Sequence, residues 1–219
     1  MARSASPKRR YDATGRRREA AQTRTGVIEA ATRAFLAHGY TGATIPRIAA
    51  DAGVAVETVY RSAAGKAGLL EAAVQAALAG GVGRADVDVE ERPAIRAVIA
   101  ETDPRRQLAA YAASQPGVWS RVGPLLGVLD AAAASDEALQ ALRDQHAEFR
   151  LNGLRRFAAL LAERGGLRPG LTVDRAADII WTVCAQANYD SLVTARGWTH
   201  DEYRDWLTDT LATHLLPAA

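Results

Sequence analysis

The sequence contains a single cysteine, Cys184, among its 219 residues. One cysteine cannot form an intramolecular disulfide, which excludes a disulfide-stabilised fold and suits a reducing compartment. No run of about 18 uninterrupted apolar residues occurs, so the sequence predicts no membrane span. No apolar segment follows the basic residues within positions 1–24, as a secretory signal would require. We therefore expect a cytoplasmic protein that does not associate with a membrane.

Groups that could perform catalysis or hold a metal ion are also few. The four histidines lie far apart and lack the paired spacing of metal ligands; they are His38, His146, His200 and His214. Cys184 stands in an apolar stretch without a basic neighbour in the sequence. The glycine-rich segment 80–83 follows an expected helix and does not open one, so it is not a phosphate-binding loop. The sequence predicts no enzyme, no metal site and no cofactor.

Aromatic residues make up only 6% of the chain, whereas hydrophobic residues as a class make up 48% and alanine is abundant. Helix-forming residues therefore outnumber the aromatic and β-branched residues that favour strands. No alternating strand pattern and no internal repeat is visible. The fold class that the sequence predicts is all-α.

The small net charge of +2 conceals an asymmetry along the chain. Residues 1–70 hold 12 Lys and Arg against 5 Asp and Glu, a formal charge of +7, whereas residues 71–219 hold 15 against 20, a charge of −5. A basic first third on an acidic remainder suggests that a polyanion binds at one end only. The alternative is a charged, disordered tail without a specific partner.

Apolar residues recur at helical spacing, and glycine, proline and capping residues separate the helical segments. Residues 1–14 lack periodicity and are expected to form a disordered basic arm. Pro116 and Gly117 predict a break or kink in one helix, because proline lacks a backbone N–H. The expected helices span about 15–38, 44–52, 56–61, 65–78, 93–100, 104–115, 119–129, 135–164, 174–196 and 199–216.

The segment 44–60 has the residue pattern of a helix-turn-helix. Two short helices can cross closely only where a small residue stands, which Ala49 supplies, and the sharp turn needs the conformational freedom of Gly53. Val54 and Val59 would fill the space between the helices. This geometry leaves the second helix protruding, so that it can enter a DNA major groove about 12 Å wide.

The same region resembles the N-terminal domain of TetR-type (tetracycline-repressor-like) transcriptional regulators. The resemblance implies a helix-turn-helix DNA-binding domain, over 15–64, followed by a larger helical ligand-binding and dimerisation domain, over 65–219. The residues that match are Gly39, Tyr40, Thr44, Ile45, Ile48, Ala49, Ala52, Gly53, Val54, Thr58, Val59, Tyr60, Lys66, Leu69 and Leu70.

Two positions depart from the family pattern. The family often has serine or threonine at the position of Ala55, where it caps the recognition helix. It also usually has a histidine and a phenylalanine at the positions of Ser62 and Ala63. Neither departure removes a group expected to face DNA.

The resemblance implies that Thr44, Tyr60 and Lys66 contact phosphates, and two hydroxyls with an ammonium suit that role. Arg47 is expected to reach a flanking phosphate. The candidates for base readout are Val56, Glu57, Thr58 and Arg61. The candidates for further backbone or minor-groove contacts are Arg9, Arg10, Arg16, Arg17 and Arg18. Alternatives remain open, namely that Tyr60 packs inside, that Glu57 and Lys66 are passive surface residues, and that the arginines only solubilise the arm.

The segment 174–196 is apolar on nearly every side, so as a helix it must be covered on every side. In the family, the last two helices form an intersubunit four-helix bundle, which implies a homodimer through about 174–196 and 199–216. The last helix would present Tyr203, Trp206, Leu207, Thr210, Leu211 and His214 at helical spacing. The alternative is a buried core helix in a monomer.

Polar and aromatic residues on otherwise apolar helices are the usual lining of a small-molecule pocket. Such residues here are Tyr111, Trp119, His146, Phe149, Asn152, Trp181, Cys184 and Asn188. Each could instead be an ordinary core residue. The sequence thus predicts a regulator that binds an operator in double-stranded DNA, as a repressor released by a small, largely apolar or aromatic effector. The alternative is a DNA-binding regulator without a small-molecule ligand, and no residue fixes whether it represses or activates.

Overall fold

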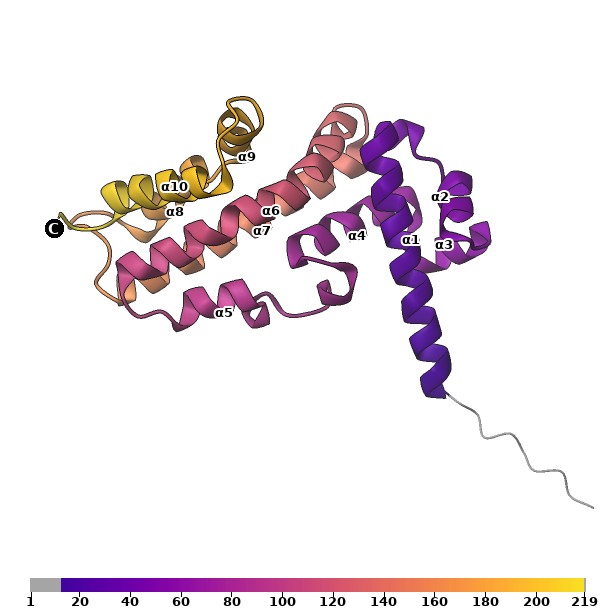
Figure 1. The fold of residues 1–219 in the computed structure, drawn as a ribbon, viewed down its shortest axis with the longest axis horizontal. Helices are drawn as coiled ribbons and strands as arrows, with labels where there is room; N and C mark the ends of the chain where they lie inside the picture. Colours follow the sequence, from indigo (N-terminus) through magenta and orange to yellow (C-terminus); the bar gives the residue numbers. More distant parts are fainter. Residues whose placement is uncertain (1–12, 219) are drawn as a thin grey trace, which may run out of the picture.

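The computed structural model describes residues 13–218, and this part of the chain is helical without a strand. The molecule is elongated, with the first helices at one end and the last helices at the other (Figure 1). The all-α prediction is confirmed. None of the helices within 13–218 is both long and apolar enough to cross a membrane.

The N-terminal helices begin and end at the residues that the sequence signals. Gly39 interrupts α1 with a φ of 65°, and Gly53 follows α2 with a φ of 66°, both in the left-handed region that glycine tolerates. The Thr44 hydroxyl oxygen accepts a hydrogen bond from the Arg47 amide at 3.4 Å and caps α2. The four helices are α1 (Ala13–Gly42), α2 (Ile45–Ala52), α3 (Val56–Ser62) and α4 (Gly65–Ala79).

The rest of the chain forms a body built around two long helices, α6 and α7, which pack against each other. Both extend along the length of the body, and α8 and α10 cover their far end (Figure 1). Two short turns, η1 (Val82–Arg84) and η2 (Val89–Glu91), precede α5. The remaining elements are α5 (Pro93–Ala100), α6 (Pro104–Ala133), α7 (Glu137–Glu163), α8 (Val173–Val183), α9 (Gln186–Tyr189), η3 (Asp190–Thr194) and α10 (His200–Leu215).

The prediction of a break at Pro116 is wrong, because α6 continues through both Pro116 and Pro124. A proline inside a helix removes one hydrogen bond and crowds the preceding turn. Here α6 packs against α1, α4, α5, α7 and α10, and its residues Pro116 and Trp119 are buried. Packing along the whole helix outweighs the local penalty at one residue.

The single helix expected over 174–196 is also wrong, because α8 ends at Val183 and a short α9 begins at Gln186. The carbonyl groups freed at the break have specific partners. Nη2 of Arg150 donates to the carbonyl oxygens of Trp181, at 3.1 Å, and Cys184, at 2.9 Å. The Asn188 amide donates to the carbonyls of Thr182 and Val183, each at 2.9 Å. Side chains that satisfy these carbonyls replace the lost helical bonds and make the break stable.

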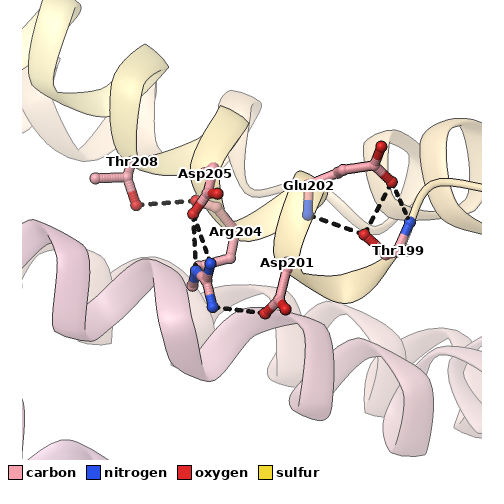
Figure 2. Close-up of polar contacts among 6 residues, drawn as sticks. All are labelled: Thr199, Asp201, Glu202, Arg204, Asp205 and Thr208. Atoms are coloured by element: carbon pink, nitrogen blue, oxygen red, sulfur yellow. Dashed lines mark hydrogen bonds and ion pairs between the residues drawn. The ribbon is translucent and has the colours of Figure 1, made fainter.

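The last helix, α10, starts with the capping box that the sequence predicts. The Thr199 hydroxyl accepts from the Glu202 amide, and the Glu202 carboxylate accepts from the amide and hydroxyl of Thr199, at 2.7 and 2.8 Å (Figure 2). The hydrogen bond that the Thr199 backbone amide donates to the Glu202 carboxylate lowers the pKa of Glu202. In the next turn, the Arg204 guanidinium pairs with Asp201 and Asp205. The capping box thus gives the backbone amides of Thr199 and Glu202, which have no backbone partner within the helix, an acceptor each.

We expect Thr199→Ala to lower the free energy of unfolding by about 1 kcal/mol, because it removes the acceptor that caps α10. Urea unfolding followed by circular dichroism measures this loss. Thr213→Ala is the matched control, since the Thr213 side chain is exposed and bonds only the Asp209 carbonyl within its own helix. Equal losses in the two variants would contradict a role for the cap.

Candidate nucleic-acid interface and interior cavity

The turn between α2 and α3 has the geometry of a helix-turn-helix. The Gly53 amide donates to the Ala50 carbonyl and the Val54 amide to the Ala49 carbonyl, at 3.1 and 3.0 Å. Ala49 and Val59 are 2% and 1% exposed, so the two helices meet closely around small and branched side chains. Both helices also pack against α1. The turn and the contacts with α1 therefore position α3 while one of its faces remains open.

The open face of α3 carries Tyr60, expected to contact a phosphate, and two of the four side chains expected to read bases, Glu57 and Arg61. Tyr60 is 57% exposed, which is unlike a packing residue, and Glu57 and Arg61 are exposed as well. Nη2 of Arg61 donates to the Thr58 hydroxyl at 3.0 Å. Val56 and Thr58 are half-buried, and Val56 packs against the core.

The residues expected to contact phosphates surround the start of α2. Thr44 and Arg47 are exposed at its first turn. The Lys66 ammonium, from α4, lies 4.4 Å from the centre of the Tyr40 ring and donates to the Thr41 carbonyl at 3.3 Å. Partial burial lowers the Lys66 pKa. Lys66 thus joins α4 to the end of α1, so it is more than a passive surface residue.

The arginines before residue 19 lie on or before the first turns of α1. Arg16, Arg17 and Arg18 are exposed, where α1 extends beyond α2 and α3 (Figure 1). Arg9 and Arg10, with most of the arm expected over 1–14, lie outside the described residues. The described arginines are positioned at the same end of the molecule as the helix-turn-helix.

The two departures from the family pattern have visible consequences. Ala55 precedes α3 with the extended backbone of a capping residue, at φ −71° and ψ 152°, but its side chain makes no capping bond. Ala63, at the position of the usual phenylalanine, lines a hollow of about 410 Å³ beside α4. α3 is therefore less well fixed at both ends than the family pattern would allow.

A cavity of about 570 Å³ lies in the body, between the end of α4, the η1–α5 segment, α6 and α7. Four of the pocket candidates line it: Tyr111, Trp119, His146 and Phe149. Its apolar walls include Leu78, Ile95, Val118, Val122 and Leu126. Burial raises the pKa of Tyr111 and lowers that of His146.

The other four pocket candidates lie away from the cavity lining, for identifiable reasons. Asn152 is exposed on α7, where its side-chain oxygen accepts from Arg155 at 3.2 Å. Cys184 lies at the break after α8, where burial raises its pKa to about 12, and Asn188 lies in α9, where its amide bonds carbonyls at the end of α8. Trp181 packs against Arg150, whose guanidinium carbon lies 4.2 Å from the centre of the Trp181 ring.

Sequence reasoning missed the arginines of the cavity, namely Arg84, Arg92, Arg121 and Arg150. Arg150 had a recognisable signal. It stands four residues before Leu154, and Leu154, Phe157, Ala158 and Leu161 form the buried face of α7. A charged residue one turn along an apolar face is a candidate for a functional group.

The residues that the last helix was expected to present to a partner differ in their burial. Tyr203, Leu207 and Leu211 are fully buried within the protomer, so the expectation that they face a second subunit is wrong. They pack inward because α10 lies on α6 and α8 of its own chain. Trp206 and Thr210 are half-buried and His214 is exposed.

Comparison with known proteins identifies the first region. Residues 27–73, from the middle of α1 into α4, match the model of a family described as bacterial regulatory proteins, tetR family. No protein among those with curated descriptions matches the sequence.

Solved structures match over nearly the whole chain. The repressor NalD of Pseudomonas aeruginosa is 20% identical over 91% of this chain and all of its own, with a TM-score of 0.68. FadR of Bacillus subtilis, described in complex with stearoyl-CoA, is 17% identical over 87% of this chain and 98% of its own, with a TM-score of 0.67. FadR of Bacillus halodurans is 18% identical over 87% of this chain and 94% of its own, with a TM-score of 0.68. At these identities the likeness establishes the fold.

We expect Ala55→Ser to raise the free energy of unfolding by about 1 kcal/mol, because a serine hydroxyl there can accept an unpaired amide of α3. Urea unfolding of the whole chain measures the gain. Ala64→Ser is the matched control, since Ala64 precedes α4 at ψ 66° and lacks extended capping geometry. A gain no larger than that of the control would show that α3 needs no cap.

Proposed function

We propose that this chain, whose residues 27–73 match the model of the tetR family of bacterial regulatory proteins, is a dimeric repressor released from its operator by a small, largely apolar ligand. The observation that carries this proposal is the exposed face of α3, held on a rigid helix-turn-helix. A protruding helix with exposed Tyr60 and Arg61 fits a major groove and can contact both base edges and backbone.

In this proposal the residues around α3 have distinct roles. Thr44, Tyr60 and Lys66, with Arg47 beside them, hold phosphates and fix the register of the protein on the duplex. Arg61 reads guanine and Glu57 reads cytosine, with Val56 and Thr58 at the edge of the readout surface. Arg16, Arg17 and Arg18 add backbone or minor-groove contacts from the first turns of α1.

The effector site of this proposal is the cavity between α4, α5, α6 and α7. Its volume, about 570 Å³, falls within the range of small-molecule sites, about 300–1,000 Å³. Its apolar and aromatic walls favour a largely apolar ligand. The stearoyl-CoA complex described for the FadR structure supports ligand binding within this fold. The division into a DNA-binding domain over 15–64 and a ligand-binding and dimerisation domain over 65–219 follows from this assignment.

We assign the homodimer to the surface of α8, α9 and α10. Half-buried apolar side chains remain on it after the protomer has folded, among them Ile179, Val183 and Trp206. Coverage by a second copy would remove this apolar surface from water, which favours association. A two-fold axis here would present two α3 helices to successive major grooves, about one DNA turn apart.

Release by a ligand requires that the ligand bind more tightly to the dimer whose two DNA-binding domains are spaced wrongly for DNA than to the dimer that binds DNA. A coupling free energy of about 1–3 kcal/mol is ordinary for such proteins. α4 connects the two parts, because it packs against α1 and also against α6 and lines the cavity. The alternative function is DNA binding without an effector, and a cavity that stays closed to every small molecule would favour it.

We expect the chain to bind DNA from around its own gene about 10³-fold or more tightly than scrambled DNA. Lys66→Ala should weaken binding to both DNAs equally and reduce the slope of log affinity against log salt by about 1. Arg61→Ala should instead reduce the preference for the specific site. Fluorescence anisotropy across a salt titration measures both effects.

Arg143→Ala provides the control for these variants, since Arg143 is half-buried on α7, outside the helix-turn-helix, and within residues 13–218 its guanidinium pairs only with Asp144. Circular dichroism of each variant checks that α1–α4 remain folded, because Lys66 also bonds the Thr41 carbonyl. Binding that is equal for both DNAs, steeply salt-dependent and insensitive to Arg61→Ala would refute sequence-specific recognition.

We expect Thr182→Arg to convert the dimer into a monomer, because it introduces a long charged side chain at an exposed position of α8 without disturbing the core. Sedimentation velocity measures the mass. Ala131→Arg, exposed on α6 away from the proposed interface, should leave the dimer intact. Loss of the dimer in the control but not in Thr182→Arg would show that the interface lies elsewhere on the molecule.

A further inference from the structure

The lining of the cavity carries charge of one sign only. Among the residues that line it are four arginines and His146, but no aspartate or glutamate. Two of the arginines, Arg92 and Arg121, donate to backbone carbonyls near its rim, those of Val87 at 3.4 Å and Ala77 at 3.1 Å. A concave, partly apolar surface with only basic side chains favours an anionic ligand.

Arg150 is the most enclosed of these arginines. Its guanidinium carbon lies 4.2 Å from the centre of the Trp181 ring and 5.5 Å from that of Trp119. Nη2 donates to the carbonyls of Trp181 and Cys184. No carboxylate within residues 13–218 pairs with Arg150, and Nε and Nη1 make no hydrogen bond there. This side chain therefore retains free donors at the cavity wall.

A buried cation without an anionic partner is costly, because the protein replaces its hydration only in part. Desolvation lowers the Arg150 pKa, and the groups that oppose this shift are Tyr111, Cys184 and Tyr203. Burial raises the pKa of each of these three groups, so they remain neutral at ordinary pH. An anion bound in the cavity would supply the missing charge.

Two further nitrogens of the lining have no hydrogen-bond partner within the described residues. Trp119 Nε1 is one, and the Trp119 side chain is only 5% exposed. His146 Nε2 is the other, one helical turn before Arg150 on α7. An indole nitrogen can only donate, so Trp119 needs an acceptor. Buried polar groups are normally satisfied, and their concentration in one cavity indicates a ligand that completes them.

We propose that the ligand of this cavity is an amphipathic carboxylic acid, whose carboxylate binds Arg150 together with Trp119 and His146. This inference rests on the proposed function, since it takes the cavity as the effector site. The planar guanidinium offers donors that match two carboxylate oxygens. The apolar part of the ligand lies along Leu78, Ile95, Val118, Val122 and Leu126, which line the same cavity.

The same arginine connects the cavity to the break after α8. A carboxylate that draws the Arg150 guanidinium toward the cavity competes with the carbonyls of Trp181 and Cys184 for its donors. Those carbonyls belong to the segment that we assign to the dimer surface. Ligand charge, and not ligand size alone, would then alter the arrangement of the two subunits.

The test compares ligands that differ only in charge. The probes are decanoate against decanamide, and 2-naphthoate against 2-naphthamide, each titrated into the full-length protein by isothermal titration calorimetry. We expect each acid to bind about tenfold or more tightly than its amide, because charge-assisted hydrogen bonds are roughly twice as strong as neutral ones. The preference should vanish in Arg150→Gln and persist in Arg143→Gln, the control on the same helix, because Arg143 does not line the cavity.

The ratio of acid to amide affinity within one variant cancels a general loss of binding caused by a disturbed fold. If Arg150→Gln does not fold, Trp119→Phe replaces it, and a reduced preference with retained amide binding supports the proposal. Equal binding of acid and amide by the natural protein would overturn the anionic assignment while leaving the cavity as an apolar effector site. A preference that survives Arg150→Gln, or no binding of any probe, would also overturn it. The DNA titration above is unaffected by these outcomes, so failure of the proposed function is recognised separately.

Discussion

The Arg150 guanidinium is the interaction on which the body of the molecule depends. It satisfies carbonyls that the end of α8 leaves open, and it packs between the rings of Trp119 and Trp181, from α6 and α8. α6, α7 and α8 are thereby joined at one point beside the cavity. A lysine could not do the same, because its ammonium is a compact, strongly hydrated charge without a planar face for stacking. Together with Asn188, which bonds the carbonyls of Thr182 and Val183, and Gln186, which bonds the Gly123 carbonyl of α6, this side chain holds the start of α9 in place.

The sequence predicts the ends of helices well wherever the signal is local. Thr44, Gly53 and Thr199 act within three or four residues of their own position, and the structure has the cap, the left-handed turn and the capping box there. The two errors, at Pro116 and at Cys184, arise from contacts distant in sequence. α6 stays helical through Pro116 because other helices pack along it, whereas α8 ends in an apolar stretch because Arg150 and Asn188 stabilise its open carbonyls. Neither effect is visible in a window of neighbouring residues.

The same distinction separates the two candidate sites. The helix-turn-helix is built from consecutive residues, so Ala49, Gly53 and Val59 suffice to predict its turn and the open face of α3. The cavity is assembled from four separate segments, and residue types alone indicated only four of its lining residues correctly. Its arginines were missed because a long basic side chain is usually solvated, even on a helix whose other side is apolar. Arg155, on the same helix, is exposed, whereas Arg150 falls on the buried face of α7.

Communication between the two sites has a short physical route. α4 lines the cavity with Leu78 and Ala79, and at its other end Lys66 bonds the Thr41 carbonyl in the last turn of α1. α4 is a continuous helix of 15 residues, so a shift imposed at the cavity reaches the Lys66 contact without passing through a loop. Arg150 lines the cavity from α7 and bonds carbonyls of the break after α8, which itself lies outside the lining. A ligand between these walls contacts both the helix that carries the DNA-binding end and the arginine that holds the proposed subunit interface. In the proposed dimer, a ligand that contacts α4 and Arg150 differently in the two arrangements would change the spacing of the two DNA-binding domains, and these differential contacts would be the source of the coupling.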